Sequence, residues 1–131
     1  MSQQAVELIL MRQLASYLTV PIFVLGADEG LLFYNEAAEA LLGKSYDEAG
    51  HMALSELPAL FEITAEDGAP LPAERLPLAI ALRERRPTHE RLRYRALNGA
   101  MRDVEVTAFP LEGQAGRHVG AVAIFWEADP P

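Results

Sequence analysis

The sequence contains no cysteine. This absence excludes disulfides, a thiol nucleophile, a zinc–thiolate site and an iron–sulfur cluster, and it is compatible with a reducing compartment. No apolar run approaches the ~18 residues that indicate a membrane span. The first residues also lack the basic flank of a secretory signal. We therefore expect a cytoplasmic protein that does not engage a membrane.

Basic residues are scarce relative to acidic ones. Eleven Lys and Arg against 19 Asp and Glu give a formal net charge of −8, which disfavours general binding to nucleic acid. Residues 1–74 hold two basic and 12 acidic residues, whereas residues 75–131 hold nine arginines and seven acidic residues. This asymmetry indicates either two electrically distinct faces or ordinary solvated surface charge.

Motifs that carry catalysis are also missing. The sequence has no Gly-x-Ser-x-Gly elbow, no phosphate-binding glycine loop and no His-Glu-x-x-His pair. The three histidines, His51, His89 and His118, have no metal-ligand spacing and no accompanying carboxylate pair. We expect neither a catalytic residue nor a metal site.

What is present fits one folded domain. A chain of 131 residues that is half hydrophobic buries roughly two-thirds of the surface exposed by its unfolded form, so it needs no cross-links. We divide it into an N-terminal amphipathic helix (residues 1–19), one domain (residues 20–129) and a tail (residues 130–131).

The N-terminal segment, residues 3–18, is predicted to be a helix that Pro21 ends. Leu8, Met11 and Leu18 recur with helical spacing, together with Ala15. Leu14 widens this apolar stripe, which covers under two heptads and is too short for a free coiled coil. We therefore expect it to dock on its own domain or on another chain, and predict a homodimer whose interface contains Leu8, Met11, Leu14 and Leu18.

A β-hairpin and a short helix follow. Residues 22–25 and 31–34 are apolar and β-prone, and residues 27–30 supply a turn in which Gly30 can adopt a positive φ. Asn35 stands where the N-cap of a helix over residues 36–42 belongs. In residues 50–72, Pro58 interrupts the helical spacing, so we expect one short helix or broken turns. Residues 77–85 form the next helix.

The last third predicts three antiparallel strands, at residues 89–96, 102–109 and 118–127. A three-residue loop over residues 97–99, with Gly99 at positive φ, keeps the apolar sides of the first two strands together. Leu92 then lies opposite Val104, while Arg93 meets Asp103 and Arg91 meets Glu105. The fold class is α+β, with a five-stranded antiparallel sheet and short helices on one face.

Five stretches in this order resemble a PAS domain: residues 22–30, 34–43, 67–78, 98–99 and 116–125. The resemblance implies a sensory or protein-interaction module that acts with an effector, such as a histidine kinase, a nucleotide cyclase, a phosphatase or a transcription regulator. It also implies a ligand site between the inner face of the sheet and the short helices. The C-terminal Pro130-Pro131 departs from the family, whose last strand often leads into a signalling helix.

The ligand-site candidates are apolar side chains expected to face that space, where they could hold a small molecule or fill the space themselves. They are Tyr34, Phe61, Leu78, Leu92, Tyr94, Val106, Ile124 and Trp126, with Phe23, Leu25, Leu41, Leu82 and Val104 around them.

The absence of cysteine excludes the covalent photosensors of the family. We expect no cofactor, and leave open a redox or gas sensor that holds a non-covalent flavin, with Trp126 or Tyr94 as stacking partner, or a haem. The resemblance disfavours haem, because haem-binding members of the family usually supply the axial histidine from the helix before the last three strands, and residues 76–85 offer no histidine. A small α+β isomerase or lyase is a further alternative. It would need an inward-facing acid or base, which the strand alternation does not offer.

Overall fold

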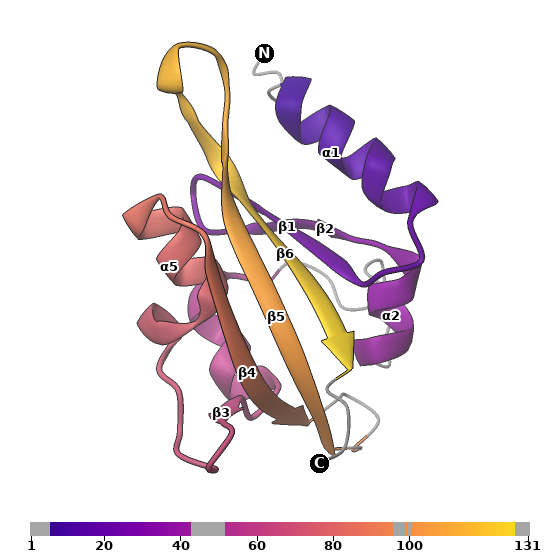
Figure 1. The fold of residues 1–131 in the computed structure, drawn as a ribbon, viewed down its shortest axis with the longest axis vertical. Coiled ribbons are helices and arrows are strands. Elements are labelled where there is room, and N and C mark those ends of the chain that lie inside the picture. The colour runs from indigo at the N-terminus through magenta and orange to yellow at the C-terminus, as the bar shows by residue number, and fades with distance from the viewer. Residues whose placement is uncertain (1–5, 43–51, 96–98, 100, 128–131) are drawn as a thin grey trace.

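The structure is a computed structural model that describes residues 6–42, 52–95, 99 and 101–127. An antiparallel sheet with strand order β2-β1-β6-β5-β4-β3 organises the chain (Figure 1). The strands are β1 (Ile22–Gly26), β2 (Leu31–Tyr34), β3 (Thr64–Ala65), β4 (Thr88–Arg95), β5 (Met101–Glu112) and β6 (His118–Glu127). The helices are α1 (Val6–Tyr17), α2 (Glu36–Leu42), α4 (Leu57–Leu60) and α5 (Pro77–Glu84), with 3₁₀ turns η1 (Leu54–Glu56), η2 (Ala73–Arg75) and η3 (Gln114–Gly116).

The sheet has six strands where the sequence predicts five. The additional strand is β3, whose two residues pair with β4, Thr64 opposite Arg93 and Ala65 opposite Leu92. Two residues are too few for an alternation of apolar and polar side chains to be visible in a sequence. The rest of the prediction, an antiparallel sheet with short helices and an N-terminal helix, is confirmed.

The predicted register between β4 and β5 is confirmed. Leu92 lies opposite Val104, Arg93 opposite Asp103 and Arg91 opposite Glu105. Gly99 has φ +92°, as the loop required, while the other residues of that loop lie outside the described part of the chain. The sequence Ser45-Tyr46-Asp47-Glu48 matches a capping box, which predicts a further helical turn, and it also lies outside the described residues.

The turn between β1 and β2 differs from the prediction in one respect. The Asp28 Oδ1 accepts a hydrogen bond from the Gly30 backbone N–H at 3.0 Å, but the residue with positive φ is Glu29 (+70°), not Gly30. This conformation places Glu29 beside Arg83 of α5, with Nε–Oε2 and Nη2–Oε1 distances of 2.6 and 2.8 Å. The first hairpin is thereby attached to the end of α5.

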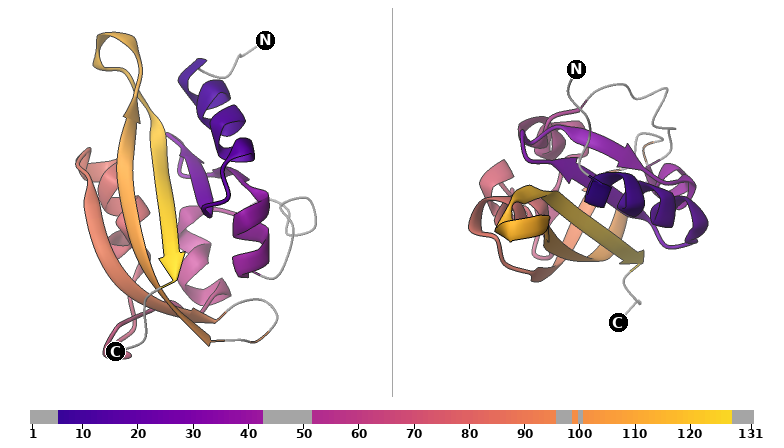
Figure 2. Two further views of the ribbon diagram at one scale, coloured as in Figure 1. Left: turned by 45° about the vertical axis from the view of Figure 1, so that its right-hand side comes forward. Right: turned by 90° about the horizontal axis from the view of Figure 1, so that it is seen from above.

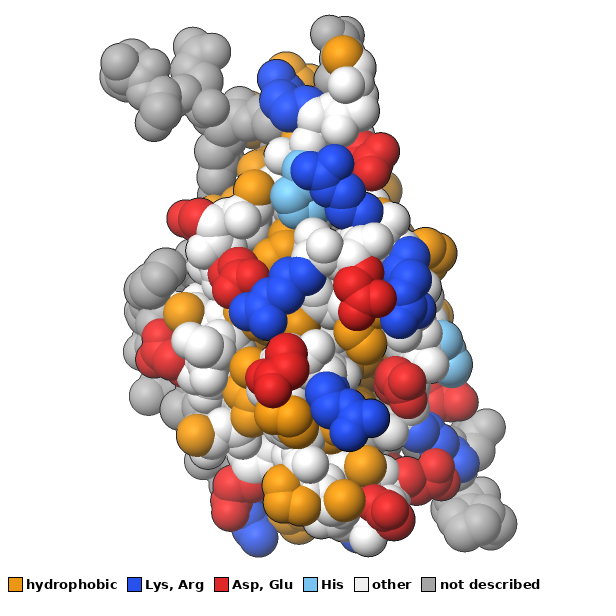
Figure 3. Space-filling view, turned by 90° about the vertical axis from the view of Figure 1, so that its left-hand side faces the viewer, with side chains coloured by type: hydrophobic (Ala, Val, Ile, Leu, Met, Phe, Trp, Pro, Cys, Tyr) orange, Lys and Arg blue, Asp and Glu red, His pale blue; other side chains and the backbone are white. Residues whose placement is uncertain are grey.

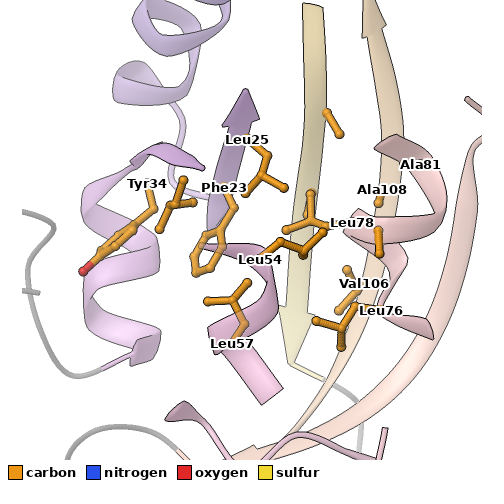
Figure 4. Close-up of a cluster of buried hydrophobic side chains, with 14 of the residues drawn as sticks. Phe23, Leu25, Tyr34, Leu54, Leu57, Leu76, Leu78, Ala81, Val106 and Ala108 are labelled. Atoms are coloured by element: carbon orange, nitrogen blue, oxygen red, sulfur yellow. The ribbon is translucent and has the colours of Figure 1, made fainter. Parts of the chain in front are cut away.

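Both faces of the sheet are packed against helices. On the inner face, α5, α4 and η1 cover the larger core, whose labelled side chains converge in Figure 4. On the outer face, α1 lies along β1 and β6 (Figures 1 and 2) and buries Leu8 and Ala15 against Ile22, Val24 and Val122. None of the described helices combines the length and the apolar character needed to cross a membrane.

Candidate functional site

The candidate site is a cavity of about 60 Å³ between the inner face of the sheet and the short helices. Residues from several elements surround it: strands β1, β4, β5 and β6, helices α4 and α5, and the segments that precede β3 and α5. The lining comprises Phe23, Leu57, Phe61, Ile63, Leu76, Pro77, Leu78, Leu92, Tyr94, Val104, Val106 and Phe125.

Aromatic rings form two sides of the cavity. On one side, the Phe23 ring stacks on Tyr34 with a centroid distance of 5.2 Å and meets Phe125 edge-on at 4.9 Å. On the other side, Phe61 and Tyr94 are edge-to-face at 6.4 Å. Distances of this size are those at which aromatic pairs attract each other beyond simple burial. The rings hold one another in fixed orientations around the cavity.

The electrostatic environment of the cavity is neutral. No residue of the lining carries a charge, and Tyr94, which is 6 % exposed, supplies its only hydroxyl. Burial raises the pKa of the Tyr94 hydroxyl well above its ordinary value, an effect that Arg102 opposes and Glu127 reinforces. Tyr94 therefore stays protonated, and the cavity presents no group that could act as an acid or a base near neutral pH.

Most predicted site residues reach the cavity. Phe61, Leu78, Leu92, Tyr94 and Val106 line it. Tyr34 is buried in the same core and stacks on Phe23, one layer behind the cavity wall.

Ile124 and Trp126 lie elsewhere, and this part of the prediction needs correction. Ile124 packs with the outer-face cluster beneath α1, and Trp126 is 44 % exposed and borders an open groove at the end of β6. Successive side chains of a strand point to opposite faces, and in β6 the inward set includes Ala121, Ala123 and Phe125. Because β6 is apolar on both faces, its sequence does not reveal which set points inward.

Several lining residues escaped the sequence analysis. Phe125 could have been found from its register partner Val106, had the β5–β6 pairing been known. Leu57 and Ile63 belong to the segment where Pro58 interrupts the helical spacing, and Leu76 and Pro77 mark the start of α5. Of these positions, Ile63, Leu76 and Pro77 carry no periodic signal.

The lining does not fit flavin or haem. Sites for molecules of that size have volumes of roughly 300–1,000 Å³ and a few placed polar groups, whereas this cavity has about 60 Å³ and a lining of hydrocarbon and one phenol. No histidine lines it to ligate a haem iron. Elsewhere in the described part of the chain, no group of three or more His, Asp or Glu is arranged to hold a metal ion.

The charged residues pair across the two halves of the sequence. Among the residues that the structure describes, four ion pairs join an acid of the first half to an arginine of the second: Glu29–Arg83 (2.6 Å), Glu66–Arg91 (3.3 Å), Glu62–Arg95 (2.6 Å) and Glu7–Arg117 (3.4 Å). Figure 3 shows acidic and basic side chains interleaved over one face. These pairs contradict the interpretation of the charge asymmetry as two electrically distinct faces.

The predicted interface residues of α1 divide between two sides of the helix. Leu8 is buried against the sheet and Met11 packs partly against it, whereas Leu14 (49 % exposed) and Leu18 (41 % exposed) face outward. We call the outward set the outer α1 face. It consists of Val6, Ile9, Leu10, Leu14, Tyr17 and Leu18, each of which is at least 41 % exposed.

Comparison with known proteins gives a consistent result. A family described as PAS fold matches residues 16–128. The PAS domain of a protein from Colwellia psychrerythraea has a TM-score of 0.65 and 18 % identity, covering 92 % of this chain and 97 % of its own.

Two further structures are similar. The PAS domain of nitrogen regulation protein NR(II) from Vibrio parahaemolyticus has a TM-score of 0.64 and 16 % identity, over 91 % of this chain and 98 % of its own. The PAS domain of BvgS from Bordetella pertussis has a TM-score of 0.63 and 18 % identity, over 95 % of this chain and 87 % of its own. No curated protein matches the chain. At these identities, the structures show a shared fold.

Proposed function

Because this chain belongs to the PAS-fold family, we propose that it is a non-catalytic sensory and protein-interaction module that responds to a small molecule bound in its core. The observation that carries this proposal is the cavity of about 60 Å³ between the sheet and the helices. The cores of folded proteins pack nearly without voids. A cavity lined by residues of so many separate elements therefore favours a role in binding a small molecule. A molecule bound there would contact both the sheet and the helices that cover it.

The proposed output is to an effector protein or domain of a signalling system, such as a histidine kinase, a cyclase or a transcription regulator. The similar structures include a PAS domain from a two-component sensor histidine kinase and one from a nitrogen regulation protein, which supports this choice of effector classes. We propose that this domain and its effector act together in the cytoplasm.

A homodimer through the outer α1 face is part of the proposal. Along α1, Val6, Leu10, Leu14 and Tyr17 follow each other at spacings of four, four and three, which aligns them in one stripe. A helix with apolar residues on its outer as well as its inner side is normally covered on both. Exposed apolar patches of several hundred Å² mark interaction sites.

A second copy suits this face. A specific interface buries on the order of 1,000 Å² or more, and each copy offers six exposed apolar side chains of the outer α1 face toward it. Helices that present the same stripe can pack against each other about a two-fold axis, which is the commonest symmetry of soluble oligomers. No charged residue belongs to the stripe to oppose this packing.

The sensory role is tested by hydrogen exchange with mass spectrometry on the full chain against a library of small neutral and charged compounds. A binding compound should slow exchange around Leu57–Leu60 and Pro77–Glu84, which supply cavity-lining residues, and alter exchange in α1. If no compound changes exchange at these segments, the domain senses no small molecule.

The cofactor-bearing alternative has a direct test. The visible absorption spectrum of the purified protein, and of the protein after incubation with flavin mononucleotide or haemin and gel filtration, should show no bound chromophore. A co-eluting flavin or haem band would replace the present proposal with a redox or gas sensor whose core rearranges around the cofactor.

A further inference from the structure

We propose that the cavity is selective for an uncharged, apolar molecule of only a few heavy atoms, such as a short hydrocarbon or an apolar dissolved gas. This inference rests on the proposed sensory function and names the chemical class of ligand for the same site. Three properties of the cavity support the inference: its volume, its lining and the pairing of the nearby charged side chains with each other.

The volume limits the size of the ligand. At about 60 Å³, the cavity is larger than the ~10–15 Å³ that one water molecule needs, but well below the roughly 150 Å³ of engineered apolar cavities that bind benzene. A single large apolar atom or a chain of two or three carbons fits without moving the walls. Ring systems and organic acids of metabolic size do not.

The lining selects against charge. A carboxylate or ammonium group would lose its hydration on entry, and no lining residue carries an opposite charge to replace it. The four aromatic rings around the cavity, Phe23, Phe61, Tyr94 and Phe125, can attract a cation, but without an acid beside them they cannot offset full desolvation. The same rings offer close dispersion contacts to a neutral guest.

The charged groups nearest to the cavity are already engaged with each other. Arg102 and Glu127, both of which influence the Tyr94 hydroxyl, form an ion pair with an Nη1–Oε1 distance of 2.7 Å. On the outer side of β4, Arg93 holds Asp103 at 2.8 Å, on the face of the sheet that points away from the cavity. The Nε of Arg102 is buried without a hydrogen-bond partner, but none of these four side chains lines the cavity to neutralise a charged guest.

One wall of the cavity can open without disrupting the main sheet. Phe61 and Ile63 lie between α4 and β3. The backbone hydrogen bonds of this segment run from Phe61 N to Leu57 O (3.0 Å), from Arg95 N to Phe61 O (2.6 Å), from Ile63 N to Pro58 O (3.0 Å) and from Leu71 N to Ile63 O (3.4 Å). The adjacent strand β3 pairs with β4 through only two residues. Segments with few such bonds open locally at a small fraction of the global unfolding free energy. A small guest needs only a brief opening of this wall.

The test uses xenon, a single apolar atom, as the probe. In the methyl-labelled 131-residue chain under xenon pressure, we expect saturable shifts of the Leu57, Leu78, Leu92, Val104 and Val106 methyl signals. Val104→Ile adds one carbon to the lining and should abolish these shifts. Val122→Ile adds the same carbon to an equally buried valine on the outer face and should retain them. If Val104→Ile does not fold, Val106→Ile serves in its place.

The results distinguish this inference from the proposed function. Unsaturable shifts spread over the molecule, or equal shifts in the Val104 and Val122 variants, overturn the cavity as the xenon site. Stronger perturbation of the same methyls by tetramethylammonium or acetate overturns the neutral ligand class but leaves a ligand-binding sensory domain. If neither xenon nor any compound of the exchange library affects the lining, both the inference and the proposed ligand response fail.

Discussion

The side-chain amide of Asn35 binds the backbone carbonyl of Ala15, with an Nδ2–O distance of 2.9 Å between residues 20 positions apart. The same nitrogen donates to the carbonyl of Val20 at 2.8 Å. Its Oδ1 accepts from the backbone N–H of Ile22 (3.1 Å) and of Ala38 (3.0 Å). Asn35 is 1 % exposed, so one buried side chain joins the end of α1, the start of β1 and the N-terminus of α2.

Asn35→Ala is expected to lower the free energy of unfolding by roughly 2–4 kcal/mol, because it leaves several buried backbone groups without their partner. Asn35→Asp separates the two roles of the side chain. It keeps the acceptors for Ile22 and Ala38 but replaces the donor that faces the Ala15 and Val20 carbonyls with a second oxygen. We expect both variants to lose hydrogen-exchange protection in α1, and only the alanine variant to lose the cap of α2.

Urea denaturation measures the stability of these variants, and exchange of the amides of α1 and α2 locates the effect. Gln13→Ala, at an exposed position of the same helix, is the control and should change little. Unaltered protection of α1 in both Asn35 variants would mean that packing of Leu8 and Ala15 alone holds the helix.

Strands β1 and β6 approach each other so closely at Gly120 that this position requires a glycine. It lies opposite Gly26 in the β1–β6 pairing, and a Cβ added at Gly120 would overlap the backbone carbonyl oxygen of Leu25. Gly120→Ala should therefore lower the free energy of unfolding by about 3 kcal/mol or more, or prevent folding, because backbone cannot move aside as a side chain can.

Gly26→Ala is the matched control for this position. Its added Cβ meets only side-chain atoms, Asp28 Oδ1 at 3.1 Å and a Leu32 methyl at 3.3 Å, which can shift slightly. Thermal unfolding gives the melting temperature of each variant, and we expect that of Gly120→Ala to be the lower. Equal melting temperatures would show that strands β1 and β6 can move apart enough to accept a methyl group.

The Glu29–Arg83 pair should make stability depend on pH in the acid range. The hydrogen bond from Arg83 lowers the pKa of Glu29 below its ordinary value of 4.5. A lowered folded-state pKa stabilises the fold above pH 4.5, and this contribution disappears as the pH falls through the folded pKa. Since both side chains are partly exposed, we expect Glu29→Gln to lose only about 0.2–1 kcal/mol at pH 7.

Urea titrations at pH 7 and at successive values below 4.5 follow the difference between wild type and Glu29→Gln, which should shrink as the pH falls. Glu84→Gln is the comparison, because its partner Arg86 is two residues away and the pair joins no separate elements. A difference that grows toward acid pH would contradict the assigned sign.

The parts of the fold predicted from sequence are those where one side of an element is apolar and the other polar. In β4, Leu92 and Tyr94 alternate with Arg91, Arg93 and Arg95, so the sequence predicted both the buried face and the register with β5. The predicted Arg93–Asp103 ion pair is present, whereas Arg91 forms its ion pair with Glu66. The N-cap at Asn35 followed from a local rule that needs only neighbouring residues. Its bonds to Ala15 and Val20 depend on the tertiary arrangement and left no local signal.

The sequence was least informative where both sides of an element are apolar or where the element is very short. In β6, Ile124 and Phe125 are equally apolar, and which one faces the cavity depends on pairing with β5. In the same way, the uneven distribution of acids and arginines along the sequence did not predict which of them form ion pairs. Glu62 and Arg95, and Glu7 and Arg117, are far apart in the sequence and meet only in the folded chain.

Two adjacent residues of α1 separate its proposed roles in dimerisation and in folding. Leu14 is 49 % exposed on the outer α1 face, whereas Ala15 is fully buried against the sheet. Leu14→Asp should convert the dimer to a monomer without lowering the melting temperature of the monomeric domain, because it removes only the surface that a second copy covers. Ala15→Asp should detach α1 and destabilise the domain by about 2 kcal/mol or more, because a carboxylate would be buried without a partner.

Light scattering coupled to gel filtration gives the mass of each variant, and exchange of the α1 amides reports whether the helix still packs on the sheet. Ser55→Asp introduces the same charge at an exposed position of η1, on the opposite side of the sheet from α1, and should leave the mass unchanged. A wild-type protein that is monomeric at high concentration, or a Leu14→Asp variant that remains dimeric, would contradict dimerisation through the outer α1 face. That face would then bind a protein of different sequence.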